Sequence, residues 1–368
     1  AGPYNYQNSE VEGIAVYTNN PPAGAFRGFG VTQSAFANEA NINQLAELVG
    51  ISPWEIRWRN AIEPGQELPN GQIAGTALKD TLLAVKEEYE KNEFVGIACA
   101  FKNAGIGVGL PDIGRTILEV KDENVIIRTS AACMGQGIGT TMTQIVCETL
   151  DLDASVVKWI KPDTKLTPNA GTSTASRQTL FTGEATRVAA LKLKEALKTK
   201  TLSELNGQEF YGEFYGKTDK MGSDKKNPVS HVAYGFATQV VVLNKDGKVE
   251  KVIAAHDVGR AINPLNVEGQ IEGGVVMGLG YALTEDYPLK DSIPTVKFGT
   301  LGLFRTTMVP ESIIVEKNNS ELAYGAKGVG EITCIPTAPA VQGAYYKYDG
   351  IFRTKLPLEN TYYKRKKV

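Results

Sequence analysis

The sequence predicts an α+β fold with two lobes, in which mixed sheets carry helices, and three observations lead to this prediction. The chain has 368 residues, which is more than one small hydrophobic core organises. Strand-like and helical stretches follow one another without strict βαβ alternation, which favours mixed sheets. Residues 63–72, EPGQELPNGQ, are rich in turn formers and mark the best internal boundary. We therefore expect one domain over residues 1–72 and another over residues 73–368.

The first 72 residues predict one strand and two helices. The segment VEGIAVYTNN, residues 11–20, has the pattern of a strand and leads into a loop. A helix is expected from about Thr32 to Val49. A second helix is expected to begin at SPWE, residues 52–55, which is a capping box with proline at the first helical position. The apolar residues expected on the buried face of the first helix are Phe36, Ala40, Leu45, Leu48 and Val49.

The rest of the chain alternates between helical and strand-like runs. Residues 77–92 have helical spacing and predict an amphipathic linker helix. The turn KDGK, residues 245–248, contains an Asp-Gly pair between two long apolar runs, which is a strong signal for a two-residue hairpin. The other expected strands lie at 94–101, 115–121, 124–132, 231–244 and 248–258, and the other helices near 138–150, 184–199, 266–280 and 337–348.

Composition and charge exclude several classes of function. The 39 basic residues are balanced by 41 acidic ones, so no net field attracts nucleic acid or a membrane surface. No apolar run approaches the length of a membrane span. The four cysteines are scattered and lack a CxxC pair, which argues against a structural zinc, an iron–sulfur cluster or a disulfide scaffold in this chain. We expect a cytoplasmic protein with reduced cysteines and neither nucleic-acid nor membrane partners.

Five loops rich in glycine and small residues stand out. None is a phosphate-binding Walker loop or a dinucleotide fingerprint, because the required Gly-Lys-Ser/Thr and the third glycine are missing. A single loop of this kind is most simply a turn in a large mixed fold. Several in one chain indicate a large, heteroatom-rich cofactor contacted through main-chain amides. The loops are AFRGFG (25–30), CMGQGIGTT (133–141), NAGTSTASRQT (169–179), DVGRAINPLNVEGQIEGG (257–274) and GAKGVGE (325–331).

Few side chains of this chain suggest ordinary catalytic chemistry. Outside the loops, His231 and His256 lie in expected strands, where structural roles are the common case. Arg27 stands between two phenylalanines, which suits either a stacked structural arginine or a contact to an anion. Glu331 ends the last loop, where it either faces water beside a tight turn or lies where the backbone has approached a ligand.

In these loops the sequence resembles the molybdenum hydroxylases, the family of xanthine dehydrogenase and aldehyde oxidase. The segments AVYTNNPPAGAFRGFG, MGQG, GTSTAS, DVGRAINPLNVEGQIEGG and GAKGVGE occur in the family's order. They resemble the C-terminal part of its molybdopterin-binding large subunit. The resemblance implies the two-lobed molybdopterin-binding architecture of the xanthine dehydrogenase type. Residues 1–72 would then be the end of the first molybdenum-binding domain, and residues 73–368 the second.

The resemblance also implies a role for each residue that matches a family motif. Glu331 would be the general base of a hydroxylation that takes its oxygen from water. Phe29 and Phe101 would contact the substrate, although Phe101 is displaced by several residues from the family's position. The Arg27 backbone amide would lie near the metal's ligand sphere, with no side chain coordinating the metal. The residues implied to bind molybdopterin are Phe26, Arg27, Gly28, Gly135, Gln136, Gly137, Thr174, Ala175, Ser176, Gln270, Lys327, Gly328 and Val329.

Finally, the resemblance implies cofactors and partners. The cofactor would be molybdopterin with molybdenum, in its cytosine dinucleotide form, with iron–sulfur clusters and FAD on partner chains. A further partner would carry the N-terminal half of the molybdenum region, without which this chain is expected to be inactive. The implied substrate is a small heterocycle such as a xanthine- or hypoxanthine-like purine. Nicotinate or aldehyde oxidation remains an alternative, and a non-catalytic binding or assembly module is a third.

Overall fold

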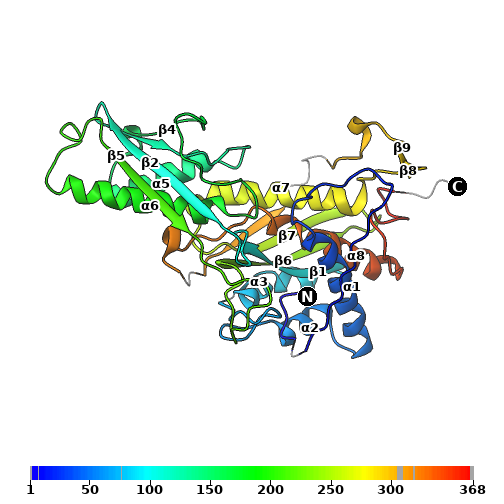
Figure 1. The fold of residues 1–368 in the computed structure, drawn as a ribbon. Coiled ribbons are helices and arrows are strands. Elements are labelled where there is room, and N and C mark those ends of the chain that lie inside the picture. Colours follow the sequence, from blue (N-terminus) through cyan, green and yellow to red (C-terminus); the bar gives the residue numbers. More distant parts are fainter. Residues whose placement is uncertain (1, 7, 76, 305–309, 318–319, 365–368) are drawn as a thin grey trace.

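The computed structural model describes residues 2–364 except residues 7, 76, 305–309 and 318–319. Figure 1 shows two lobes, and each contains one mixed four-stranded sheet of described residues covered by helices. Both sheets combine antiparallel pairs with one parallel pair. The expected α+β class with mixed sheets is therefore confirmed.

The sheet of the larger lobe is formed by strands that are far apart in the sequence. β1 and β7 both pair with β6 in antiparallel fashion, and β10 joins β7 in parallel. The predicted hairpin between β6 and β7 is confirmed, although its loop is longer than two residues: the Asn244 amide donates to Lys248, and Gly247 has a φ of 74°. In sheet order the strands are β1 (Val95–Ala104), β6 (Ala233–Leu243), β7 (Val249–Asp257) and β10 (Glu311–Val315).

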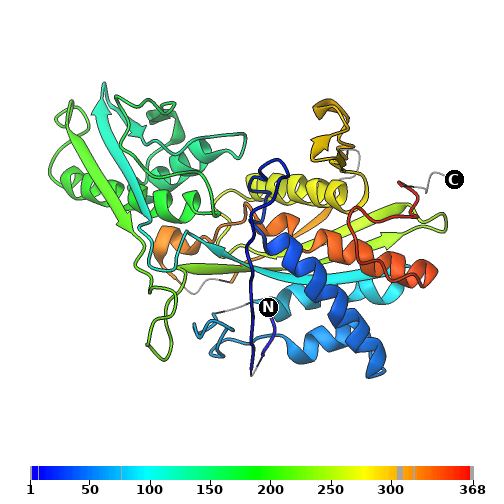
Figure 2. The ribbon, with the colours of Figure 1, turned by 45° about the vertical axis from the view of Figure 1, so that its right-hand side comes forward.

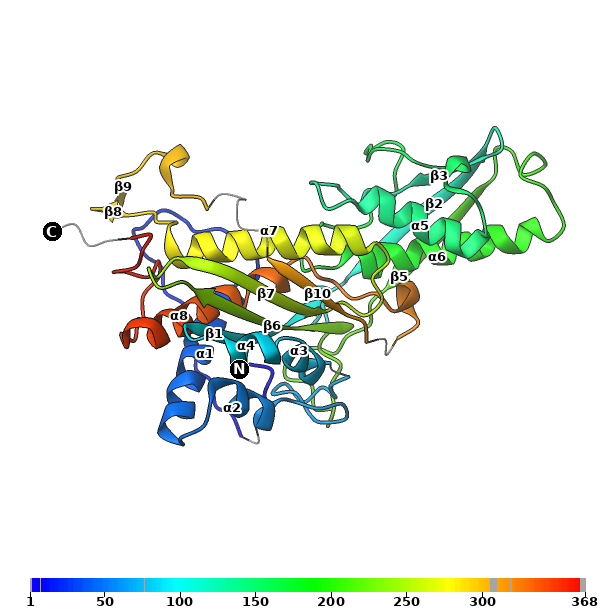
Figure 3. The same ribbon diagram turned by 180° about the vertical axis from the view of Figure 1, so that it is seen from behind.

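Helices cover both faces of this sheet. α7 (Pro264–Leu283) and α8 (Thr337–Asp349) pack on one face, and α2 (Pro53–Asn60) and α3 (Leu78–Ala84) pack on the other. Gly96 of β1 allows α8 to approach, because a Cβ atom there would lie only 2.1 Å from the Ala340 carbonyl oxygen. Figure 3 shows α7 lying along the sheet toward the smaller lobe. The remaining helices of this lobe are α1 (Val31–Leu48), which contacts α2 and α8, and the short α4 (Lys86–Lys91).

The smaller lobe is a four-stranded sheet with two helices on one face. Its β2 strand alternates between buried and half-buried residues, which is the pattern of a sheet with one face in the core. The helices α5 (Ile138–Leu150) and α6 (Gln178–Leu197) cover that face. In sheet order the strands are β4 (Val157–Trp159), β3 (Asn124–Arg128), β2 (Ile113–Lys121) and β5 (Glu209–Tyr215). A separate two-stranded ribbon joins β8 (Leu289–Lys290) to β9 (Ile293–Pro294).

The strand predicted at residues 11–20 is wrong. The segment is extended and crosses the larger lobe, as Figure 2 shows in dark blue, but it forms no ladder with the described residues. Its apolar side chains are open to solvent, with Ile14 at 79% and Tyr17 at 107% exposed. An alternating pattern produces a strand only where a neighbouring strand accepts its backbone hydrogen bonds.

The first helix is confirmed, but its buried face differs from the predicted one. Phe36 and Ala40 are buried, whereas Leu45 is 48% and Leu48 is 81% exposed, and Val49 lies beyond the helix end. Glu39 is buried and occupies a position on the helix face that packs into the core. The linker helix predicted over 77–92 divides at Val85 into α3 and α4. The short or charge-rich strands β4, β5 and β10 were not predicted.

Residues on both sides of position 72 share one core. Leu68 and Trp54 belong to the same buried cluster as Val95 and Phe236. The lobes visible in Figure 1 instead set the region of β2 to β5 apart from the rest. The domain boundary at 72/73 stays a prediction about the family's domains. Among the residues described, none of the helices combines the length and apolar character that crossing a membrane requires.

Because His256 is buried, we predict that the folded chain loses stability in acid. This histidine is fully buried in β7, and this burial lowers its pKa to about 3, with nearby Arg27 acting in the same direction. The unfolded chain has a histidine pKa of about 6.5, so it binds more protons below that pH. The stability contributed by neutral His256 is therefore complete above pH 6.5 and declines as the pH falls toward 3.

We expect His256→Gln to remove part of this acid sensitivity. Between pH 7 and 4.5 the variant should lose about 2–3 kcal/mol less unfolding free energy than the parent chain. Urea denaturation of both proteins at the two pH values measures this difference. An equal acid loss in parent and variant would show that His256 does not titrate on unfolding.

Candidate functional site

Arg27 connects three of the five glycine-rich loops. It lies in the loop before α1, and its guanidinium donates to the Gly330 carbonyl oxygen in the last loop. The same group donates to the main-chain and side-chain oxygens of Gln270 in α7, both at 3.2 Å. Its own carbonyl oxygen accepts from the Thr32 hydroxyl at 2.9 Å. Hydrogen bonds therefore hold the Arg27 side chain, which in turn fixes the segment that leads to Glu331.

Ser176 joins the third loop to the last one. Its hydroxyl accepts a hydrogen bond from the Glu331 backbone amide at 2.9 Å and lies 3.5 Å from the Glu331 Oε2 atom. Ala175 and Ser176 have φ angles of 48° and 51°, a strained conformation that is typical of functional sites. Only glycine fits at position 328, since a Cβ atom there would lie 1.8 Å from the Ser176 carbonyl oxygen.

Lys102 is the charged partner of Glu331, and the sequence reasoning missed it. Its Nζ atom lies 3.3 Å from Glu331 Oε2, and the two side chains are only 7% and 14% exposed. The ammonium also donates to the Asn103 side-chain oxygen at 2.6 Å. A lone lysine and asparagine ending the apolar run of β1, in AFKNAG, was the available signal.

The second loop lies against the third loop and α7. The Ser173 hydroxyl donates to the Ala132 carbonyl oxygen at 3.1 Å. The Asn266 side-chain amide reaches the Gly137 carbonyl oxygen at 3.4 Å, which connects the smaller lobe to the start of α7. Together with the contacts of Arg27 and Ser176, these bonds bring all five predicted loops into one region between the lobes.

The backbone in this region is open at some positions and packed at others. A Cβ atom at Gly30, Gly135 or Gly269 would have no atom within 4 Å, whereas one at Gly137 would lie 2.3 Å from the Asn266 side chain. The Gln136 side chain, in contrast, is occupied inside its own loop, where it accepts from the Met134 amide and donates to the Ala132 carbonyl oxygen. Thr174 is exposed in the third loop. The residues present therefore fit a ligand contacted mainly through main-chain groups.

The three predicted aromatic residues lie in different surroundings. Phe26 packs on Tyr281 of α7, with ring centres 5.1 Å apart. Phe29 is 68% exposed and has a φ of 48°. Phe101 packs on Tyr234 and Phe236, and because neighbouring strand residues point to opposite faces, it lies on the other side of the sheet from Lys102. The structure does not bring Phe101 to Glu331.

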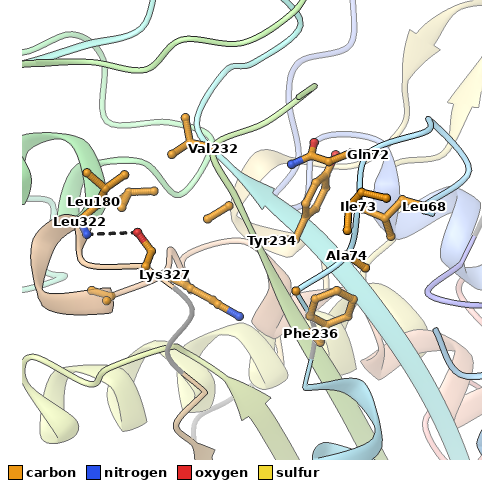
Figure 4. A pocket seen from close by; sticks show the side chains of 15 residues that line it. Leu68, Gln72, Ile73, Ala74, Leu180, Val232, Tyr234, Phe236, Leu322 and Lys327 are labelled. Carbon is orange, nitrogen blue, oxygen red and sulfur yellow. Dashed lines mark hydrogen bonds between the residues drawn. The ribbon is translucent and has the colours of Figure 1, made fainter. Parts of the chain in front are cut away.

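Lys327 also points away from Glu331. Its ammonium pairs with the buried Asp257 carboxylate at 2.5 Å and lies over the Phe236 ring. Both Lys327 and Phe236 line a separate pocket of about 250 Å³, shown in Figure 4, and Glu331 is not among its lining residues. Val329 is half-buried beside Glu331. Within the described ranges, no three His, Cys, Asp or Glu side chains gather as a metal site.

Comparison with known proteins identifies the class. Two molybdopterin cofactor-binding domain families match the chain, one over residues 1–61 and the other over residues 77–207 and 201–310. The aldehyde oxidoreductase structure from Desulfovibrio gigas superposes with a TM-score of 0.80 and 26% identity, over 90% of this chain and 40% of that one. The fold is thus that of a molybdopterin-binding protein.

Curated relatives define the family. A putative xanthine dehydrogenase molybdenum-binding subunit of Escherichia coli is 30% identical over 93% of this chain and 53% of its own length. An aldehyde oxidoreductase of Megalodesulfovibrio gigas is 29% identical over 96% of this chain and 43% of its own length. This chain belongs to the molybdenum hydroxylase family. It spans about half the length of the curated relatives it matches.

Cys133, in the second loop, is expected to be the most reactive thiol. The backbone amides of Gly135, Gly137 and Ile138 hold its pKa below the usual value, and it is exposed. Burial raises the pKa values of Cys99 and Cys334 to about 12. Because the thiolate is the nucleophile, iodoacetamide at pH 7.5 should label Cys133 first, as measured by peptide mass spectrometry.

The Cys133→Ser variant provides the control and should lack the fast labelling phase. A cofactor bound over residues 135–137 should slow the reaction at Cys133 in the loaded protein. Faster labelling of the half-buried Cys147 would contradict the prediction.

Proposed function

We propose that this chain is the catalytic molybdopterin-binding part of a hydroxylase that acts on a purine-like N-heterocycle, with water as the oxygen source. The observation that carries the proposal is the position of Glu331. Its carboxylate is 14% exposed and ends the loop held by Arg27 and Ser176, in the region where all five loops converge. The names of the relatives that include xanthine dehydrogenase and hypoxanthine oxidase favour a purine.

In this proposal Glu331 is the general base. The Glu331 carboxylate is largely withdrawn from water, and the bond from its backbone amide to Ser176 fixes the residue in place. Such a carboxylate can accept the proton of the attacking water as the oxygen adds to the substrate carbon. The proton remains on Glu331 until it returns to solvent. The exposed Phe29 ring is available for contact with a flat heterocycle.

The cofactor proposed here is molybdopterin in its cytosine dinucleotide form. The residues assigned to hold it are the backbone of the Arg27–Gly28, Gly135–Gly137 and Thr174–Ser176 segments, together with Gln270 and the backbone at Gly328. When bound, the molybdenum supplies a Lewis acid and a two-electron acceptor. The open space at Gly135 supports this assignment, as do the internal hydrogen bonds of the Gln136 and Gln270 side chains, which favour contact through main-chain groups.

We also propose that the active assembly contains the preceding half of the molybdenum region, an iron–sulfur component and an FAD component. The length of the relatives supports the first of these. The segment 11–20 supports it too, because its extended backbone and its exposed apolar side chains Val11, Ile14, Val16 and Tyr17 are available for contact with another chain segment.

Aldehyde oxidation is the second candidate. The similarity to an aldehyde oxidoreductase, in sequence and in structure, is nearly as strong as the sequence similarity to the xanthine dehydrogenase subunit. Glu331 would serve as the base in that reaction as well.

The test combines composition with turnover. The purified native complex should contain about one molybdenum and one pterin per chain, and it should reduce a dye acceptor with xanthine or hypoxanthine. Reduction with aromatic aldehydes alone would favour the second candidate, and reduction with nicotinate alone would move the substrate to pyridines. A native complex free of molybdenum and pterin would refute the hydroxylase proposal and leave a binding or assembly module.

A further inference from the structure

We propose that Lys102 is a positioning residue that orients the carboxylate of Glu331 so that Oε1 is the oxygen that accepts the proton. This inference rests on the proposed role of Glu331 as the base. Lys102 lies at the end of β1, and its ammonium is 3.3 Å from Glu331 Oε2.

The contacts of the carboxylate are one-sided. Lys102 and the Ser176 hydroxyl both approach Oε2, at 3.3 Å and 3.5 Å. Within the described part of the chain, Oε1 has no hydrogen-bond donor. A carboxylate held through one oxygen keeps the other available for a proton.

Lys102 is itself held in place by its neighbours. Its ammonium donates to the Asn103 side-chain oxygen at 2.6 Å, and the Asn103 amide donates to the Gly105 carbonyl oxygen at 2.7 Å. The Gly105 amide in turn donates to Ala175, next to Ser176, at 2.9 Å. Both groups that contact Oε2 are thus connected through one short chain of hydrogen bonds.

Because the ion pair of Lys102 and Glu331 is largely buried, its loss is expected to affect both stability and catalysis. The two side chains are 7% and 14% exposed, so removal of the ammonium leaves a largely buried carboxylate without its counter-charge. That carboxylate is then free to rotate, so Oε1 no longer keeps the orientation needed to accept the proton. The substrate contacts remain.

The experiment compares Lys102→Met, Lys102→Arg, Glu331→Gln and the double variant Lys102→Met/Glu331→Gln in the whole complex. Lys102→Met should lower kcat by about 10–100-fold with KM changed less than about threefold, since positioned general bases contribute roughly 10²–10⁴-fold. Lys102→Arg keeps the charge and should recover a large part of kcat. The matched control is Lys225→Met, which breaks the solvent-exposed pair with Asp219.

A second measurement does not depend on turnover. Thermal unfolding of the complex from molybdate-depleted cells should show a lower Tm for Lys102→Met, and the added Glu331→Gln should raise it again by removing the unpaired charge. Additive losses in Tm, or a normal kcat for Lys102→Met, would overturn the inference. Loss of turnover in Glu331→Gln with a normal Lys102→Met defeats only the role of Lys102. Normal turnover in metallated Glu331→Gln defeats the proposed function itself.

Discussion

Glu331→Gln is expected to lower kcat by at least about 10²–10⁴-fold while molybdenum and pterin contents stay at parent levels. The amide has nearly the same size as the carboxylate and keeps the backbone bond to Ser176, so the loop is expected to hold its shape. An amide cannot accept the proton of the attacking water, so the chemical step is lost. The measurement is dye reduction under saturating substrate, normalised to bound molybdenum.

The same substitution at an exposed glutamate provides the matched control. Glu250 is an exposed residue of β7, and Glu250→Gln should leave kcat unchanged. Turnover near the parent rate in fully metallated Glu331→Gln would remove Glu331 from the reaction. The assignment of the base would then have to move to another group of the complex.

Arg57→Met is expected to destabilise the chain by about 3–5 kcal/mol, the usual cost of leaving one partner of a buried ion pair. Arg57 and Glu39 are both fully buried, and their side chains meet at 2.8 Å. Glu39 also accepts from the Tyr4 hydroxyl at 2.6 Å and from the Cys99 amide at 2.8 Å. The pair therefore joins the N-terminal segment, α1, α2 and β1.

Urea denaturation of the chain measures this loss, with Arg59→Met as its control. Arg59 is 62% exposed and pairs with Glu55 on the same helix, so its replacement should cost less than about 0.5 kcal/mol. The double variant Arg57→Met/Glu39→Gln should recover part of the stability lost in Arg57→Met. Equal effects of Arg57→Met and Arg59→Met would contradict the role given to the buried pair.

Local patterns predicted most elements of the fold. The N-cap expected at Ser52 is confirmed, since its hydroxyl accepts from the Glu55 amide at 3.0 Å, although the Glu55 carboxylate pairs with Arg59. The hairpin at Gly247 and the helices α5 and α8 also follow signals within a few residues. Such signals act through backbone preferences that hardly depend on distant contacts.

The errors arose where distant contacts decide. Leu48 was expected inside, but the burial of Glu39 against Arg57 turns α1 so that Leu48 is exposed. Residues 11–20 have the composition of a strand yet lack a partner among the described residues. The family resemblance implies Phe101 as a substrate contact, whereas strand alternation places it on the face opposite Lys102.

The sequence by itself determined the α+β class, the five small-residue loops and, through their order, the resemblance to the family. These features are carried by residue type and spacing along the chain. Only the tertiary structure decided which side chains meet: Lys102 lies 229 positions before Glu331, yet the two are 3.3 Å apart. The reason is physical. A charge pair across the fold depends on sheet register and loop packing, which no local pattern encodes.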